Sequence, residues 1–288
     1  MGCLIAYADD TCLTMEADSL AELKVLLQEE GTRVLSFFAS NEMVANPSKT
    51  AMLILRPAIP RVRESPFEIK LREATIIESQ HERLLGVHFT SDLRWNNHVE
   101  KLKSETSYAL SVLSRLEHLL SSKHLKAIAN GIIMSRLRYC LPVFGAESLR
   151  FDESDTKSTV GYQIQLIQNK MLRLLVGCRQ SDRVRVHDML ESVNMLSINQ
   201  QIGFDILIEL WKAKNFEVPH LMSLLDRHRN DTRILRSDTT GKASATNLEP
   251  FAMNGARLWN MTGGAFRTTN LLKVAKAEAR KVAKCLPI

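Results

Sequence analysis

The sequence predicts an α+β protein in which antiparallel strands and one helix are followed by a mostly α-helical remainder. Short apolar runs with the spacing of strands fall within the first ninety residues. Longer stretches, with apolar residues three, four and seven apart, fill the rest of the 288 residues and are typical of amphipathic helices. Hydrophobic residues make up 45% and charged residues 24%, which are ordinary values for a globular chain.

The first feature along the chain is the acidic tetrapeptide Tyr7-Ala8-Asp9-Asp10, which lies between two short apolar runs. So short a separation predicts a tight β-hairpin with the carboxylates of Asp9 and Asp10 at its tip. Because Mg²⁺ prefers oxygen ligands, such a tip is a natural Mg²⁺ site. Consecutive strand residues point to opposite faces, so both carboxylates can reach the same ions only if the turn reorients them.

One helix and several further strands are expected in the part of the chain that ends at residue 91. Ser19 and Glu22 match a helix capping box, and the apolar spacing beyond them predicts a helix from about Ser19 to Ala39. The strands are expected at residues 51–55, at the hairpin pair 67–71 and 74–77, and at 83–89. In the last of these, Gly86 is expected to mark a bulge or a close approach by another backbone.

Beyond residue 91 the apolar spacing is helical. Two long helices that pack as an antiparallel pair are expected at about 96–120 and 122–139. Further helical stretches are expected at 161–177, 183–195, 197–215 and 269–284, and a polar loop at 226–250. The chain therefore divides into four expected segments: strands and helix in 1–91, helices in 92–149, a polar linker in 150–160, and a helical C-terminal region in 161–288.

Charge is distributed unevenly along the chain. Residues 1–50 have a net charge of −5, whereas residues 51–288 have a net charge of +11. An acidic tip beside a basic body suits a metal site that faces a phosphate-binding surface. The plainer interpretation is a basic protein with no particular partner.

The cysteines and the first residues of the chain predict the cellular compartment of the protein. The five cysteines are scattered without a Cys-x-x-Cys pair, which predicts reduced thiols in an intracellular protein of the nucleus or cytoplasm. The first residues lack the pattern of a secretory signal, and no uncharged apolar run approaches the roughly 20 residues that cross a bilayer. We therefore expect no membrane partner.

Several motifs follow one another in a recognisable order. They are Tyr7-Ala8-Asp9-Asp10, Asn46-Pro47-Ser48-Lys49-Thr50, Leu84-Leu85-Gly86-Val87, Leu93-Arg94-Trp95-Asn96-Asn97-His98-Val99, Arg257-Leu258-Trp259-Asn260 and Leu286-Pro287-Ile288. In this order the chain resembles the reverse transcriptases of non-LTR (LINE-type) retrotransposons, over essentially its whole length and most specifically in residues 4–100. The resemblance implies part of a polymerase palm in 1–91, a helical thumb in 92–149 and a helical tail in 161–288.

The resemblance also implies an activity and a set of ligands. The activity is RNA-templated DNA synthesis by two-metal nucleotidyl transfer, with Mg²⁺ as cofactor and an RNA template and a DNA primer as partners. Asp9 matches the carboxylate that binds the catalytic metals, and Asp10 matches its less directly coordinating neighbour. Tyr7 matches the residue near the incoming nucleotide and the primer end.

Further along the chain, Lys49 matches the lysine near the triphosphate, and Leu85-Gly86 matches the strand that positions the primer. Lys101 and Lys103, on the outer face of the first long helix, are the expected nucleic-acid contacts. Some of these residues also have a purely structural interpretation. Lys49 could be a loop lysine and Leu85 a core residue, and His98 is expected to cap a helix or to face solvent.

The beginning of the chain departs from the family pattern. No Asp or Glu precedes Asp9, whereas the family places a strand with a further catalytic aspartate before this motif. We expect a truncated reverse transcriptase that is inactive alone, with a sheet edge left unpaired where that strand would lie. Two alternatives stay open: a non-catalytic basic RNA/DNA-binding module, and a helical protein-interaction remnant that uses residues 161–288.

Overall fold

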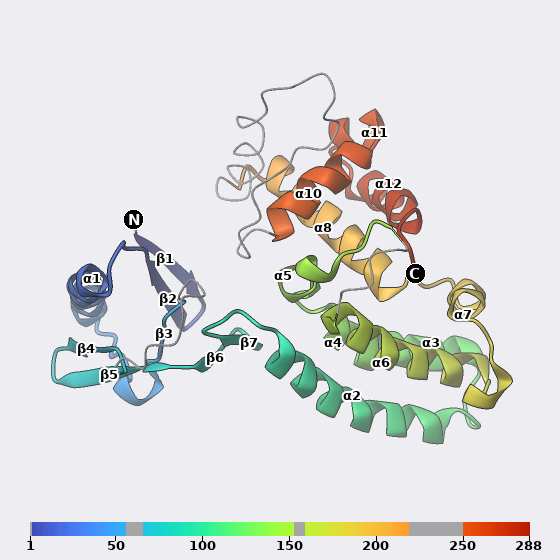
Figure 1. Ribbon diagram of the computed structural model, residues 1–288, viewed down its shortest axis with the longest axis horizontal. Helices are drawn as coiled ribbons and strands as arrows, with labels where there is room; N and C mark the ends of the chain where they lie inside the picture. The colour runs from blue at the N-terminus through green and yellow to red at the C-terminus, as the bar shows by residue number, and fades with distance from the viewer. Residues whose placement is uncertain (1, 56–65, 153–158, 219–249) are drawn as a thin grey trace. The chain divides into compact units, whose positions relative to one another are not determined.

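The computed structural model describes residues 2–55, 66–152, 159–218 and 250–288. The chain forms two compact units, Met1–His98 and Val99–Ile288. The described strands all belong to the first unit, and the second unit is built from helices, which confirms the predicted α+β class (Figure 1). The division falls inside the stretch 92–149. The expected linker and the expected polar loop lie largely outside the described residues.

The first unit contains seven described strands and one long helix. The strands are β1 (Gly2–Tyr7), β2 (Asp10–Met15), β3 (Met52–Leu53), β4 (Glu68–Leu71), β5 (Ala74–Ser79), β6 (His81–Leu84) and β7 (Val87–Thr90), and the helix is α1 (Leu20–Ser40). β1 and β2 form an antiparallel pair, and so do β6 and β7. In the three-stranded sheet β3-β5-β4, β3 runs parallel and β4 antiparallel to β5.

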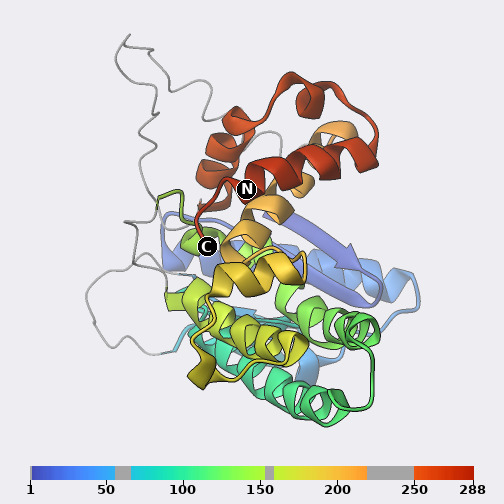
Figure 2. The same ribbon diagram turned by 90° about the vertical axis from the view of Figure 1, so that its right-hand side faces the viewer.

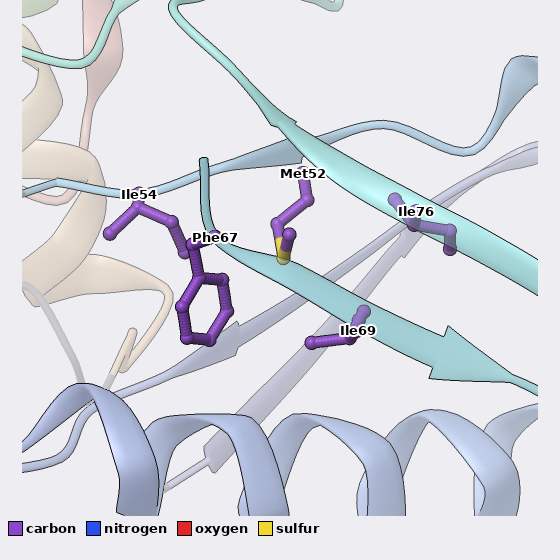
Figure 3. Packing of buried hydrophobic residues seen from close by; sticks show 5 residues of the cluster. All are labelled: Met52, Ile54, Phe67, Ile69 and Ile76. Carbon is purple, nitrogen blue, oxygen red and sulfur yellow. The ribbon is translucent and has the colours of Figure 1, made fainter. Parts of the chain in front are cut away.

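The core of the first unit lies between α1 and the three-stranded sheet. Five buried side chains form it, and Figure 3 shows them close to α1: Met52, Ile54, Phe67, Ile69 and Ile76. Leucines of α1 pack against this cluster. The helix begins as predicted, because the side chain of Ser19 accepts a hydrogen bond from the N–H of Glu22 at 3.2 Å. By contrast, neither β1 nor β2 has a buried residue.

The three hairpins share one unusual property. Each is closed by a two-residue loop whose first residue has a positive φ, namely Ala8 (52°), Arg72 (54°) and Leu85 (47°). L-residues other than Asn and Asp rarely adopt this conformation, at a cost of about 1–2 kcal/mol. The cross-strand hydrogen bonds on both sides of each loop therefore hold the turns in place.

The second unit is helical. Its described α-helices are α2 (Asn96–Leu116, which begins in the first unit), α3 (Ser122–Ala129), α4 (Ser135–Arg138), α5 (Leu141–Phe144), α6 (Thr159–Val176), α7 (Val186–Ser192), α8 (Ile198–Asn215), α10 (Pro250–Met261), α11 (Gly264–Thr268) and α12 (Leu272–Lys284). A π-helical turn, Asn130–Met134, joins α3 to α4. The Arg136 guanidinium donates to the Glu105 carbonyl at 3.3 Å, which joins α4 to α2.

Helix α8 forms the centre of this unit. Its N-terminus is closed by a capping box between Ser197 and Gln200, and 12 of its 18 residues are buried. Helices α5, α6, α10 and α12 pack around it (Figure 2). The core of the second unit is therefore arranged around a single enclosed helix.

Buried amides connect distant parts of the chain to α8. The side chain of Asn199 donates to the carbonyls of Arg150 and Pro287 at 3.0 and 2.9 Å, and that of Gln200 donates to the Leu286 carbonyl at 3.1 Å. Buried polar groups need such partners, because leaving one unpaired costs about 1–3 kcal/mol. The last residues of the chain are thus fixed to the start of α8.

No helix among the described residues combines the length and the apolar character needed to pass through a lipid bilayer.

The enclosed position of α8 predicts a large effect of truncating one of its side chains. Ile206 is 0% exposed, so Ile206→Ala removes buried methylene groups and leaves a cavity. We expect the free energy of unfolding to fall by about 2–5 kcal/mol, measured by urea denaturation. The control is Leu166→Ala, at an aliphatic side chain that is 42% exposed. Equal losses in the two variants would contradict the central role of α8.

Candidate functional site

The acidic tetrapeptide forms the predicted hairpin tip. Tyr7 and Asp10 are paired across β1 and β2, and the loop between them consists of Ala8 and Asp9 alone. Asp9 therefore lies in the turn, whereas Asp10 is the first residue of β2. Because Asp9 is not part of a strand, the alternation that separates neighbouring strand side chains does not apply to this pair.

The strand register places an aromatic side chain beside the second carboxylate. Tyr7 and Asp10 lie directly opposite each other on one face of the hairpin, where Cβ atoms are about 5 Å apart. Ile5 and Cys12 pair on the same face. The Tyr7 side chain is 67% exposed, and both aspartates are exposed. The tip thus presents two carboxylates and one phenol to a ligand in solution.

Two carboxylates do not make a complete metal site. Across the described parts of the chain, no three His, Cys, Asp or Glu side chains form a group that could hold a metal ion. The hairpin is therefore a partial fit to a two-metal centre, which needs more carboxylate oxygen than one turn provides.

Lys49 lies at the end of a short 3-10 turn, Pro47–Lys49, which precedes β3. The side chain of Asn46 builds this turn, since its oxygen accepts hydrogen bonds from the N–H and the hydroxyl of Ser48 at 3.0 and 2.7 Å. The Thr50 hydroxyl donates to the Asn46 carbonyl at 3.0 Å. Lys49 itself is exposed. The motif is therefore a self-contained turn that presents a lysine to solvent.

The prediction of a single strand over 83–89 is wrong. Leu84 pairs with Val87, and Leu85 and Gly86 are the two-residue loop between β6 and β7. Both loop residues have positive φ, 47° and 86°, which is the sign pattern of a type I′ turn. Gly86 is thus a turn residue and not a bulge, and Leu85 is 40% exposed at the end of a hairpin.

The segment between β7 and α2 is held by the side chains of Thr90, Asp92 and Trp95. The Thr90 hydroxyl and the Arg94 N–H both donate to one Asp92 carboxylate oxygen, at 2.7 and 3.1 Å. Trp95 packs its ring edge-on to Phe89 at 5.3 Å. These contacts fix the start of α2 against the β6–β7 hairpin.

The expectation that His98 faces solvent is wrong. It is only 3% exposed, and its Nδ1 accepts a hydrogen bond from the His88 N–H at 3.4 Å. The His88 and His98 rings lie 6.2 Å apart. His98 is therefore part of the packing at the start of α2.

The two lysines expected to contact nucleic acid are close to carboxylates of their own helix. Lys101 lies 3.9 Å from Glu105, and Lys103 lies 3.6 Å from Glu100. All four side chains are exposed, so these pairs are weak. They nevertheless reduce the local positive charge of α2.

The structure therefore brings together only some of the candidate residues. Tyr7, Asp9 and Asp10 share one tip, whereas Lys49 and the Leu85-Gly86 turn belong to other elements. Among the described residues no hydrogen bond or ion pair joins Lys49 to either aspartate. The lysines of α12 were not predicted to have a role, although their regular spacing is visible in the sequence.

Comparison of the chain with protein-family models, with curated proteins and with solved structures gave no match.

Asp92 predicts a pH dependence at the junction before α2. The hydrogen bond from Thr90, followed by the Arg94 N–H and the Arg94 charge, holds the pKa of Asp92 below its ordinary value of 3.8. Ionised Asp92 therefore stabilises the folded state above pH 3.8, and this stabilisation is lost as the pH falls through the lowered pKa. An NMR titration of the carboxyl carbon should show this, with Asp92→Asn identifying the signal. A midpoint at or above 3.8 would contradict the contacts described.

The turn between β6 and β7 predicts a stabilising substitution. Leucine is unfavourable at a φ of 47°, whereas Asn-Gly is the preferred pair for this turn. We expect Leu85→Asn to stabilise the hairpin by about 1 kcal/mol, measured by hydrogen exchange of the β6 and β7 amides. Leu84→Asn, one residue earlier in the strand, is the control and should not stabilise. Similar destabilisation by both substitutions would exclude the turn.

Proposed function

We propose that this chain is part of a reverse transcriptase of the non-LTR retrotransposon type, an RNA-directed DNA polymerase, and that its β1–β2 hairpin carries metal-binding carboxylates. The observation that carries the proposal is the exposed tip, where Asp9 lies in a two-residue turn and Asp10 begins the next strand. This arrangement allows both carboxylates to face the same ions. The order of the sequence motifs supports the same proposal.

The hairpin supplies only part of such a site. In nucleotidyl transfer, two divalent ions about 3.5–4 Å apart activate the attacking hydroxyl and stabilise the charge of the transferred group. Two carboxylates of one turn do not surround both ions, and no third ligand joins them among the described residues. We therefore assign no catalytic step to the tip alone, and we expect turnover to need a further carboxylate.

Other residues of the first unit have proposed roles in holding the substrates. The exposed ammonium group of Lys49 would neutralise charge on the triphosphate. The phenol of Tyr7, on the same face as Asp10, would lie beside the nucleotide and the primer end. The Leu85-Gly86 turn would contact the primer. The helices that start with α2 would clasp the duplex as a thumb, with Lys101 and Lys103 near its phosphates.

Binding of a paramagnetic ion tests the role of the tip. With the chain bound to an RNA/DNA primer-template, Mn²⁺ should selectively broaden the NMR signals of the residues around the Ala8–Asp9 turn. Asp9→Asn should abolish the broadening, because the turn carboxylate is lost. Asp18→Asn, at an exposed aspartate between β2 and α1, is the charge-matched control. Uniform broadening at all acidic residues, or none at the tip, would refute the proposal.

Primer extension separates metal binding from turnover. The chain alone should not extend a primer on an RNA template in Mg²⁺, because no third carboxylate of the described residues lies with Asp9 and Asp10 at the tip. Extension that Asp9→Ala abolishes would show that the carboxylates of this chain suffice.

A non-catalytic nucleic-acid-binding module is the second candidate, and the net charge of +11 in residues 51–288 favours it. Such a module would bind RNA or an RNA/DNA duplex with an affinity that falls as the salt concentration rises. The Mn²⁺ experiment separates the two candidates, since a binding module has no selective metal effect at Asp9.

A further inference from the structure

Helix α12 is the most basic helix among the described residues. Its sequence contains five basic residues and one acidic residue: Lys273, Lys276, Arg280, Lys281, Lys284 and Glu278. The ion pair of α12 in the described structure joins Lys281 to Glu278 at 2.6 Å. Lys273, Lys276 and Lys284 are exposed, and no ion pair to a described carboxylate involves them. The helix thus retains a strong positive charge.

Four of the five basic residues lie on one side of the helix. At 100° per residue, Lys273, Lys276, Arg280 and Lys284 fall within an arc of about 80°, and we call these four residues the basic stripe. Glu278 is about 120–160° away from every member of the stripe. At a rise of 1.5 Å per residue the stripe is about 16 Å long. A row of cations is therefore presented without an intervening carboxylate.

Packing on α8 fixes the direction in which the stripe faces. Ala275, Ala279 and Ala283 are each 0% exposed, and α12 packs on α8. The Arg280 guanidinium donates to the carbonyl and the side chain of Asn194 at 3.0 and 3.1 Å, which joins the stripe to the segment before α8. The stripe is therefore held by a rigid support.

Two macromolecular partners could bind such a stripe, namely an anionic membrane and a nucleic acid. A basic amphipathic helix binds membranes by inserting its apolar face, but the alanine face of α12 is already covered. The exposed apolar side chains near the stripe, Leu271, Leu272 and Val274, are confined to the first turn of the helix. A nucleic-acid backbone needs no apolar face, only cations that match regularly spaced phosphates.

We propose that the basic stripe of α12 binds the phosphate backbone of a nucleic-acid duplex without sequence preference. The four cations of the stripe, spread over about 16 Å, can each neutralise one phosphate of the duplex backbone. Helix α2 is less suitable, because three basic residues there are accompanied by Glu100 and Glu105. This inference is independent of the acidic hairpin, since it needs neither metal nor catalysis.

Salt dependence of DNA binding tests the stripe. The probe is a fluorescent 20-base-pair DNA duplex of random sequence, titrated with the full chain at several salt concentrations without divalent ions. The triple variant Lys273→Gln, Lys276→Gln and Lys284→Gln should weaken binding at least about tenfold at 0.1 M salt. It should also reduce the slope of log K against log salt by about 2–3, because each phosphate contact contributes about 0.9. Arg280 is left intact because it also supports the fold.

A charge-matched control separates the stripe from net charge. Lys70, Lys123 and Lys170 are exposed lysines on β4, α3 and α6, and their replacement by Gln removes the same total charge. The control should change the slope by less than one unit, and circular dichroism melting should give similar midpoints for both variants. Equal loss of binding in the two variants would overturn the proposal. So would stripe-dependent binding to phosphatidylserine vesicles without binding to the duplex.

Discussion

The enclosure of α8 is the constraint on which the second unit depends. A helix with 12 of its 18 residues buried must be covered over most of its surface, and here α5, α6, α10 and α12 cover it. The small side chains of Ala275, Ala279 and Ala283 let α12 approach closely. Since that side of α12 is used for packing, its lysines have to lie on the outside. The spacing of alanines and lysines in α12 therefore determines both how this helix packs and where its positive charge is exposed.

The first unit depends on a different principle, the short hairpin. Its turns place Ala8, Arg72 and Leu85 in a left-handed conformation that their side chains disfavour, so the strand ladders must supply the compensating free energy. At the acidic tip, the left-handed conformation of Ala8 belongs to a turn that contains Asp9, which therefore lies outside β2. The position of the Asp9 carboxylate thus depends on the β1–β2 ladder, and β2 in turn contacts α1.

Strong local patterns allowed much of the fold to be predicted. The hairpin at Tyr7–Asp10, the helix that follows Ser19 and the long amphipathic helices all have such patterns. The β6–β7 hairpin was missed because Leu84 and Leu85 continue an apolar run and leucine is not a turn former. Distant contacts such as that of Gln200 with Leu286 have no local signal at all. For the candidate site, the residues at the tip could be predicted, whereas the side of α12 that faces outward depends on α8.

The β1–β2 hairpin has no buried residue and pairs with no other strand among the described residues. Isolated two-stranded hairpins are only marginally stable in water. An ion bound to Asp9 and Asp10 would add its binding free energy to that of the β1–β2 ladder and of the contacts between β2 and α1. Its apparent affinity falls in proportion to the fraction of molecules in which the turn is formed. We expect a partner strand added to either edge of the hairpin to tighten the binding of such an ion without touching a carboxylate.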